Sequence, residues 1–345
     1  MDIEAIDTPG QLQQLRPEWE SLWHRSLTAT PFQHPGWLIP WWNSFGGGEL
    51  YTFAARAQGR LIGLAPMFLH SCNGRRQVKF LGNGISDYLD ILCEPDGGPA
   101  VAGAMFARLA ERRDSWDLCD LQDLRRQSAL LELTSSLPLE SATRPQYACS
   151  VIPLAKTVEE FEQSLPHGLR RNLRRYRSQL EGEGPVGFET AGPGQFEEHV
   201  DALFALHRAR WNEKHSPGVL SDPGVERFHH SAVRDLWQSG LVRLHALRCG
   251  GTIVAVVYAL AHRKRAYSYL GGFDPRLARF SPGALIMKYT IDRAIGEGVQ
   301  EFDFLRGSEP YKSEWGARPQ ATSRLLLWHQ HRPDDLLENA APEAE

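Results

Sequence analysis

Residues 267–317, YSYLGGFDPRLARFSPGALIMKYTIDRAIGEGVQEFDFLRGSEPYKSEWGA, decide how this chain folds. Small and aromatic residues alternate from Ala266 to Leu270, which predicts a strand. Gly271-Gly272 at its end allows a bulge or a close backbone approach by a ligand. A helix from Pro282 to about Ile295 follows, and then a short strand, Val299 to Leu305. The stretch therefore predicts a strand–loop–helix–strand unit.

The start of this helix has the features of an anion site. Ser281 is expected as the N-cap, and Pro282 takes the first helical position, where its missing N–H costs nothing. Gly283 and Ala284 follow without side chains that would block the first N–H groups, and Arg279 lies close by. Free N–H groups and the positive end of the helix dipole together favour a bound anion.

Two resemblances follow from these residues. The loop from Arg279 to Ala284 resembles the coenzyme loop of the GNAT acyltransferases, usually written Gln/Arg-x-x-Gly-x-Gly/Ala, although Pro282 replaces the usual first glycine and Gly283 lies one place away. A wider resemblance, over roughly Pro31 to Trp315, is to the CelD-type acetyltransferases associated with cellulose biosynthesis, which are related to the Fem peptidoglycan peptidyltransferases. It is carried by SPGALIMKYTIDRAIGEG, FDFLRG, YKSEW, PFQHPGWLIPWWNSFG and FLGNGISDYLD.

The second half of the chain repeats the order of the first, with Gly59 preceding one strand by about the distance from Gly250 to another. We therefore expect an α/β fold of tandem GNAT-like domains, each a mixed, mostly antiparallel sheet flanked by helices. Residues 1–155 form the first domain, without a coenzyme loop, because Gly97-Gly98-Pro99 lacks the arginine and the Ser-Pro-Gly-Ala features. Residues 156–332 form the second, with the acyl-CoA site, and residues 333–345 a flexible tail.

Other elements are expected from periodicity and turn residues. The pattern predicts a helix from Thr8, an aromatic helix around residues 37–42, a hairpin over 50–70, an extended region over 78–93, a helix over 100–113 and a strand over 116–121. It also predicts helices over 192–214 and 222–240 and a hairpin over 241–262. His215-Ser-Pro-Gly218 is a candidate lid loop.

Composition indicates which classes of function and which cellular location to expect. The net charge of −4 does not favour a general DNA-binding protein. Five scattered cysteines fit a reducing compartment and argue against a structural zinc site, and the histidines lack metal-ligand spacing, so no metal is expected. The polar N-terminus is unlike a signal peptide, and the longest apolar run is shorter than the about 20 residues that span a bilayer. We expect a cytoplasmic protein without a membrane span.

Residues 166–184 contain an amphipathic helix with a basic face. Leu169, Leu173, Tyr176 and Leu180 form one apolar stripe, flanked by arginines that include Arg170, Arg171 and Arg174. Two interpretations remain open. The helix docks through its stripe and leaves a solvated basic face, or the arginines bind phosphates of coenzyme A, a nucleotide-linked precursor or an RNA end.

Acyl transfer to an amine needs a proton acceptor and an oxyanion donor. Asp303, between Phe302 and Phe304, is a candidate for the first role; the alternative is that it anchors the turn at Arg306-Gly307. The Fem resemblance implies Lys312 as oxyanion stabiliser and Tyr311 as positioning group or proton donor. The ISDYLD resemblance implies Asp87 and Tyr88 as acceptor-binding residues across the domain cleft.

Three functions remain at this stage. The first is an acyl-CoA-dependent N-acyltransferase, with acetyl-CoA or another acyl-CoA as donor and an amine or nucleotide-linked sugar as acceptor, in envelope or exopolysaccharide metabolism. The second is a Fem-like enzyme with an aminoacyl-tRNA donor, which the net negative charge and the absence of a long coiled-coil arm disfavour. The third is a non-catalytic GNAT-fold module of a polysaccharide-synthesis complex, which the partial loop match allows.

Overall fold

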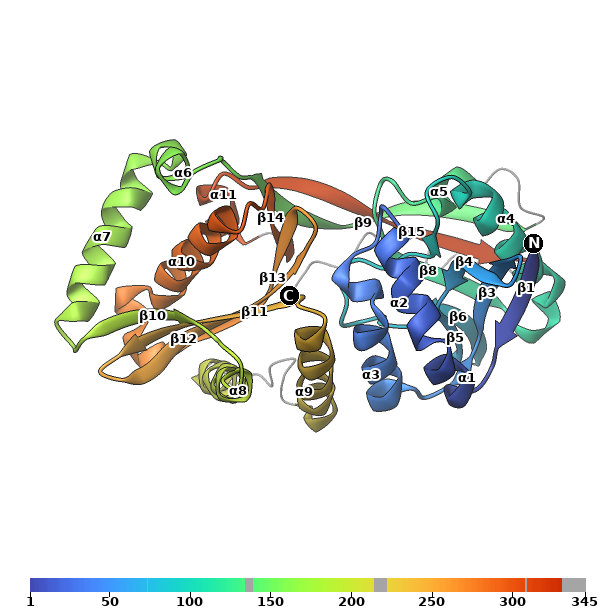
Figure 1. Ribbon diagram of the computed structural model, residues 1–345, viewed down its shortest axis with the longest axis horizontal. Coiled ribbons are helices and arrows are strands. Elements are labelled where there is room, and N and C mark those ends of the chain that lie inside the picture. Colours follow the sequence, from blue (N-terminus) through green and yellow to red (C-terminus); the bar gives the residue numbers. More distant parts are fainter. Residues whose placement is uncertain (73, 134–138, 214–221, 308, 331–345) are drawn as a thin grey trace. The chain divides into compact units, whose positions relative to one another are not determined.

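A computed structural model (Figure 1) describes residues 1–345 except residues 73, 134–138, 214–221, 308 and 331–345. The chain divides into two compact units. Unit 1 consists of Met1–Ala148 and Ala321–Glu345, and unit 2 of Cys149–Gln320. The first boundary lies close to the predicted one, whereas the last strand belongs to unit 1 rather than to the second domain. The reason is that residues from Ala321 onward contribute a strand that pairs within unit 1.

Unit 2 is built around a mostly antiparallel sheet with the strand order β10-β11-β12-β13-β14-β9. Only β13 and β14 run parallel among these described neighbours. Its elements are β9 (Glu140–Pro153), α6 (Val158–Ser164), α7 (His167–Glu181), β10 (Val186–Thr190), α8 (Phe196–Glu213), α9 (Pro223–Gln238), β11 (Val242–Cys249), β12 (Thr252–His262), β13 (Arg265–Phe273), the 3-10 helix η4 (Pro275–Phe280), α10 (Pro282–Gly296), β14 (Glu301–Arg306) and α11 (Pro310–Glu314).

Helices cover both faces of this sheet (Figure 1). α10 packs on β11, β12 and β13 from one side and α8 packs on the same strands from the other, while α7 packs against α10, η4 and β10. Gly272 on β13 lets α8 approach closely, because a Cβ there would lie 3.3 Å from the Leu203 carbonyl oxygen. The close approach that the glycine pair predicted is therefore made at Gly272 by a helix, and Gly271 is exposed.

Unit 1 has two smaller sheets, split where β4 meets β5 at Pro66, which has no N–H to donate to a sheet. Its elements are β1 (Asp2–Ile6), α1 (Pro9–Gln14), α2 (Arg16–Arg25), η1 (Pro31–Gln33), α3 (Pro35–Phe45), β2 (Glu49–Leu50), β3 (Thr52–Ala57), β4 (Arg60–Ala65), β5 (Met67–Cys72), β6 (Arg75–Phe80), β7 (Leu92–Cys93), α4 (Gly98–Glu111), η2 (Arg113–Ser115), β8 (Leu118–Leu124), α5 (Leu130–Leu133) and β15 (Arg318–Trp328).

The two units repeat one strand order, as the sequence predicts. When β2 with β3 and β4 with β5 are each taken as one interrupted strand, unit 1 has the order β1, β3/β2, β4/β5, β6, β8, β15, which matches the six strands of unit 2 one for one. In both units the only parallel neighbours in this described order, β6 with β8 and β13 with β14, are joined through a helix, α4 or α10.

The repeat extends to a local irregularity. Both β8 and β14 carry a bulge against their antiparallel partner, and in each the residue before the last paired one is left-handed: Asp123 with φ 62° and Leu305 with φ 60°. The final strand in this order is placed differently along the chain in the two units: β9 comes first in unit 2, whereas β15 of unit 1 comes after the whole of unit 2.

Most expected elements are confirmed, with three differences. The extended region over 78–93 is strand only to Phe80 and again at Leu92–Cys93, β13 runs on to Phe273, and the polar turn after β14 contains a short helix, α11. The Trp37 and Trp41 side chains of the aromatic helix are buried. The sequence did not indicate β1, β9, β10 or β15. The candidate lid at residues 215–218 and the tail at residues 333–345 lie outside the described residues.

Candidate functional site

The pairing of β13 with β14 ends partway along the sheet of unit 2, and we call the place where the two strands separate the opening. The two strands pair only over Arg265 to Tyr267 and Glu301 to Asp303, although both continue beyond these residues. Two residues further on, β13 bulges at Tyr269, opposite a register shift in β12. Residues 268–270 are only partly buried and Gly271 is exposed, even though β13 is an interior strand, whereas Tyr267 is buried.

The start of α10 follows β13 after η4. Ser281 is the N-cap and Pro282 the first helical residue, as predicted, but Ser281 is left-handed (φ 46°, ψ 52°) and its side chain makes no capping hydrogen bond. Its carbonyl oxygen instead accepts from Ala284 N at 3.0 Å and Leu285 N at 3.2 Å. No hydrogen bond from the Gly283 N–H occurs among the described residues, and Gly283 is half-buried. This N–H and the helix dipole leave room for an anion.

Arg279 sits on η4 beside this helix start. Its side chain is exposed, with its guanidinium 4.5 Å from the centre of the Phe280 ring and 3.0 Å from the Glu183 carboxylate. An anion at the Gly283 N–H would compete with Glu183 for Arg279. The assignment of Arg279, Ser281, Gly283 and Ala284 to coenzyme binding stays a prediction.

Asp303 lies on β14 where the pairing with β13 ends, and its side chain is fully buried. Its Oδ1 accepts a hydrogen bond from the N–H of the left-handed Leu305 at 2.9 Å, and its Oδ2 lies 3.4 Å from an Arg265 guanidinium nitrogen. Asp303 thus anchors the bulge that leads into the Arg306-Gly307 turn, which is the alternative that the sequence left open. A catalytic role for Asp303 stays a prediction.

Lys312 on α11 is buried, with 3% of its surface exposed. Its Nζ donates to three consecutive carbonyl oxygens, those of Leu305 at 3.3 Å, Arg306 at 2.6 Å and Gly307 at 3.2 Å, and lies 2.8 Å from the Glu309 carboxylate. The ammonium therefore holds the exit turn of β14. Gly307 is required here, because its φ is 114° and a Cβ would lie 2.8 Å from the Lys312 Nζ.

Tyr311, the residue before Lys312, is 42% exposed and contacts Phe304 edge-on, with ring centres 6.0 Å apart. The structure thus brings Asp303, Tyr311 and Lys312 together around the end of β14, beside the opening. Their catalytic roles stay predictions.

In unit 1 the equivalent opening is filled by the chain itself. β6 and β8 pair only at Gln77 with Leu118 and Val78 with Cys119. Beyond this point, the Leu89 N–H donates to the carbonyl oxygen of the left-handed Asp123 at 3.2 Å. Residues 86–92 are buried, including Asp87 at 6% and Tyr88 at 3% exposure. The segment that contains the two residues predicted to bind the acceptor therefore occupies this opening in unit 1, and their role stays a prediction.

A buried carboxylate fixes this segment. The Asp90 Oδ1 accepts from the Ser128 hydroxyl and from the Ile91 N–H, both at 2.8 Å. Burial raises the pKa of Asp90 to about 6, against the opposing effect of the Ser128 hydrogen bond and of Arg125. The two hydrogen bonds of Asp90 thus hold the loop in place, although burying its carboxylate away from water is unfavourable.

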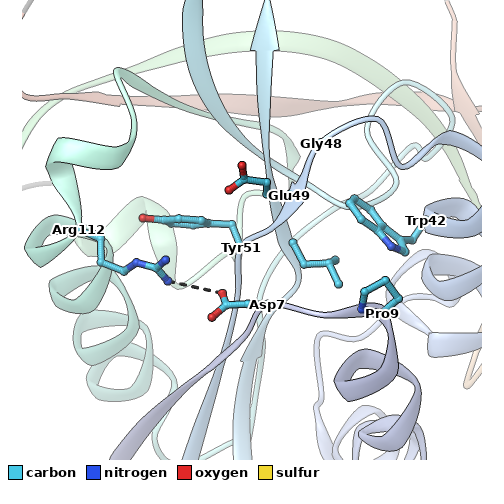
Figure 2. Close-up of a pocket in the computed structure, with 8 residues that line it drawn as sticks. Asp7, Pro9, Trp42, Gly48, Glu49, Tyr51 and Arg112 are labelled. Atoms are coloured by element: carbon cyan, nitrogen blue, oxygen red, sulfur yellow. Dashed lines mark ion pairs between the residues drawn. The ribbon is translucent and has the colours of Figure 1, made fainter.

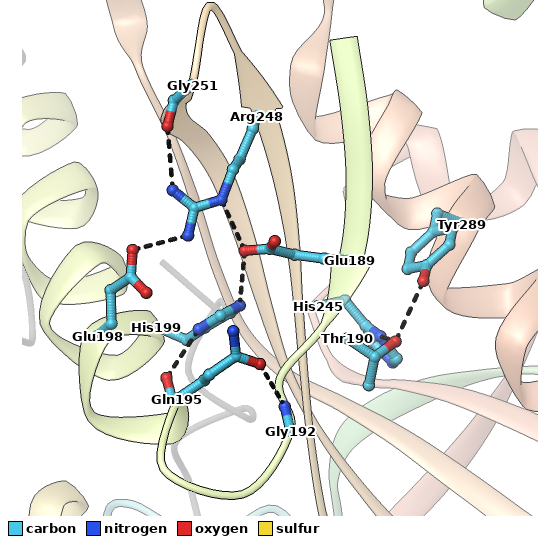
Figure 3. A network of polar contacts seen from close by, with 10 residues as sticks. All are labelled: Glu189, Thr190, Gly192, Gln195, Glu198, His199, His245, Arg248, Gly251 and Tyr289. Carbon is cyan, nitrogen blue, oxygen red and sulfur yellow. Dashed lines mark hydrogen bonds and ion pairs between the residues drawn. The ribbon is translucent and has the colours of Figure 1, made fainter.

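A polar network ties the edge of unit 2 together (Figure 3). The Glu189 carboxylate on β10 accepts from Arg248 on β11 at 2.8 Å and lies 3.3 Å from the His199 Nε2 on α8. Thr190 lies next to it, with its hydroxyl 2.9 Å from the His245 Nδ1 and 3.2 Å from the Tyr289 hydroxyl on α10. The network therefore links β10, β11, α8 and α10. The sequence gives no local indication of it, because its members are far apart in the chain.

A pocket of about 490 Å³ lies in unit 1, between the start of α1, α3, β2 and the end of α4 (Figure 2). Arg112 in it stacks over Tyr51 at 4.4 Å and lies 3.7 Å from Asp7, beside Trp42 and Glu49. None of the predicted site residues lines it. Within the described part of the chain, no group of three or more acidic, histidine or cysteine side chains is placed to hold a metal ion, and no helix has the length and apolarity to cross a membrane.

Arg265 belongs to the predicted catalytic region but was missed by sequence reasoning, and Gly307 was named only as part of the exit turn. Gly307, in a turn after a strand, could have been singled out as a position that needs positive φ. Nothing local to Arg265 indicates its contact with Asp303, which depends on the register of the parallel pair.

Comparisons with known proteins agree with this architecture. Residues 167–313 match the family model described as an acetyltransferase (GNAT) domain. No curated protein sequence matches the chain. Among solved structures the chain is similar to FemX, with a TM-score of 0.67 and 10% identity over 98% of this chain and 100% of that one.

Two further structures are similar at the same level of sequence identity. A conserved protein of unknown function from Bacteroides thetaiotaomicron VPI-5482 gives a TM-score of 0.62 and 12% identity over 95% of this chain and 100% of that one. A tandem GNAT protein from the clavulanic acid biosynthesis pathway gives a TM-score of 0.50 and 10% identity over 94% of this chain and 98% of that one. The predicted fold class is confirmed: the chain has a tandem GNAT fold, and its residues 167–313 form a GNAT acetyltransferase-like domain.

Proposed function

We propose that unit 2 binds an acyl-CoA in the opening between β13 and β14 and transfers the acyl group to an amine. The supporting observation is the end of the β13–β14 pairing at Tyr267 and Asp303. Strands that separate expose N–H and C=O groups, and a linear chain with its own amides, such as the pantetheine arm of coenzyme A, can pair with them. The Gly283 N–H at the start of α10 would then bind the pyrophosphate.

The proposed reaction uses residues around the end of β14. The amine nitrogen attacks the thioester carbonyl carbon, the C–N bond forms, and the C–S bond breaks as the amine loses a proton and the thiolate gains one. In this proposal Lys312 stabilises the oxyanion, Tyr311 positions or protonates the leaving thiolate, and Asp303 accepts the proton of the amine. Lys312 would have to exchange one carbonyl contact for the oxyanion, and the 3.3 Å contact to Leu305 is the longest of the three.

Calorimetry with acetyl-CoA tests donor binding. Gly283→Glu places bulk and negative charge at the helix start, where a Cβ already lies 3.3 Å from Phe273, and should abolish binding. Gly296→Glu is the matched control, since it makes the same change at the far end of α10, where a Cβ meets nothing within 4 Å. Unchanged affinity in Gly283→Glu would place the donor elsewhere. Native mass spectrometry of freshly purified protein provides a second readout, a co-purified coenzyme A species.

An aminoacyl-tRNA donor is the second candidate, because the likeness to FemX covers nearly the whole of both chains. It predicts transfer from aminoacyl-tRNA and no binding of acetyl-CoA. The third candidate, a non-catalytic module, predicts no turnover with either donor. From the CelD resemblance we also propose a cytoplasmic enzyme of envelope or exopolysaccharide metabolism that acts on an amine or a nucleotide-linked sugar. An acceptor panel tests that assignment.

A further inference from the structure

Two groups of arginines take no part in the proposed reaction. Arg170, Arg171 and Arg174 lie on α7, which docks on the core of unit 2 through its predicted apolar stripe, and their phosphate-binding role stays a prediction. Arg112, at the end of α4, lines the pocket of about 490 Å³ in unit 1. A cation that lines a cavity can meet a ligand there, so the pocket is the better place to look for a second site.

This pocket has a charged side and an apolar side (Figure 2). Asp7, Tyr51 and Arg112 lie together on one side of it, and Trp42 and Pro9 lie on the other. Small-molecule sites are usually cavities of about 300–1,000 Å³ with an apolar lining and a few polar groups that fix the orientation of the ligand. The arrangement therefore fits a small ligand with a charged end and an apolar end.

Hydrogen bonds fix the charged side of the pocket. The Ser115 hydroxyl donates to the Arg112 carbonyl oxygen at 2.7 Å, so it accepts from the Tyr51 hydroxyl, also at 2.7 Å. The Arg112 guanidinium lies 4.4 Å from the centre of the Tyr51 ring, where a cation is attracted to the ring face. The Asp7 N–H donates to the Gln11 Oε1 at 3.1 Å. Neighbouring residues thus hold the backbone of both Arg112 and Asp7 in place.

The charged groups of the pocket neutralise each other only in part. Arg112 and Asp7 approach to 3.7 Å, which is too long for a hydrogen bond, and both side chains are partly exposed. Arg56 of the same unit, by comparison, lies 2.6 Å from Glu18. Within the described part of the chain, the Arg112 guanidinium donates no hydrogen bond, and Glu49, which also lines the pocket, has no cation beside its carboxylate. These groups can therefore bind the charges of a ligand.

We propose that the pocket binds an α-amino acid with an apolar side chain, in its zwitterionic form. A simple anion would meet the carboxylates of Asp7 and Glu49, and a simple cation would meet Arg112. The ammonium and carboxylate of an α-amino acid are attached to the same carbon atom, so they can bind the neighbouring Asp7 and Arg112 together. The apolar side chain then packs on Trp42. The site lies within unit 1, and the inference does not depend on the function proposed for unit 2.

NMR titrations by saturation-transfer difference, which detects weak binding, test this site on the full-length protein. L-Phenylalanine carries both charges at neutral pH, whereas 3-phenylpropionate lacks the ammonium and 2-phenylethylamine lacks the carboxylate. The protein should bind L-phenylalanine about tenfold more tightly than either of the other probes, because each of them loses one hydrogen bond between charged groups.

Substitutions then assign each charge of the ligand to its partner. Arg112→Gln should weaken binding of L-phenylalanine about tenfold and remove the preference over 2-phenylethylamine. Asp7→Asn should remove the preference over 3-phenylpropionate. Arg108→Gln is the matched control, because it removes the same charge from α4 at an exposed position, 2.8 Å from Glu111, that does not line the pocket. It should bind all three probes as the wild-type protein does.

Other results overturn the proposal. Failure to bind L-phenylalanine, or equal affinity for the three probes, rejects an amino-acid site. Tighter binding of 3-phenylpropionate identifies an anion site instead, and tighter binding of 2-phenylethylamine a cation site. A preference that survives in Arg112→Gln places the ligand outside this pocket. If Arg112→Gln does not fold, Asp7→Asn decides by the same comparison, since its side chain is half-exposed. None of these measurements involves acyl transfer, so their outcome is independent of the function proposed for unit 2.

Discussion

Lys312→Met tests whether the ammonium on α11 serves the reaction or only the turn. The substitution keeps the stem length and removes the charge from a side chain that is 3% exposed. It leaves three carbonyl oxygens, of residues 305–307, without their donor. At about 1–3 kcal/mol for each buried unsatisfied group, and with partial access of water at residues 306 and 307, we expect the free energy of unfolding to fall by about 3 kcal/mol. If Lys312 also meets the oxyanion, turnover should fall about a hundredfold with donor affinity nearly unchanged.

The assay measures urea unfolding, acetyl-CoA affinity and transfer to an amine panel for each variant, at a temperature where all are folded. Glu309→Gln is the control, because it removes the half-exposed carboxylate of the same ion pair and leaves the carbonyl contacts in place. It should change stability by less than about 1 kcal/mol and turnover by only a few-fold. Lys312→Arg should rescue little, since a planar guanidinium does not replace a compact ammonium among three carbonyls. Normal turnover in folded Lys312→Met, or a loss explained by weaker binding, would refute the catalytic assignment and leave Asp303 as the leading candidate.

Two predictions concern buried titratable groups. Burial lowers the pKa of His245 from 6.5 to about 3, so below pH 6.5 the unfolded chain binds the proton first. Because the unfolded-state imidazole is already half protonated at pH 6.5, stability should fall by about 2.3 kcal/mol between pH 6.5 and 4.5, and urea titrations of His245→Gln should lack this component. Burial raises the pKa of Asp90 to about 6, so stability falls as the pH rises from 3.8 to about 6, and the full cost of the buried carboxylate is present above that pH. Asp90→Asn keeps an oxygen for Ser128 and Ile91, and should raise the melting temperature at pH 7.5 but not at pH 4. A gain of equal size at both pH values would show that ionisation of Asp90 is not what destabilises the fold.

The sequence by itself determined the helices and strands that depend on nearby residues alone. Strand alternation and turn residues predicted the β11–β12 hairpin, and the predicted helix from Pro282 to about Ile295 matches α10 to within one residue of its end. The apolar stripe of α7 likewise predicted which face docks, since 3.6-residue periodicity needs no knowledge of the partner. The repeated order of these local elements was enough to predict two copies of one unit.

Only the tertiary structure decided the features that depend on residues far apart in the chain. The Arg265–Asp303 contact follows from strand register, and the left-handed Leu305 is held by Asp303 on one side and Lys312 on the other. The filled opening of unit 1 and the placement of β9 and β15 are equally non-local, because strand pairing joins segments that no periodicity links. Left-handed Leu305 contradicts its own intrinsic preference, and such a conformation persists only where the surrounding contacts outweigh its strain. The sequence could therefore predict which residues gather near the end of β14, but not that Lys312 would be buried among backbone carbonyls there.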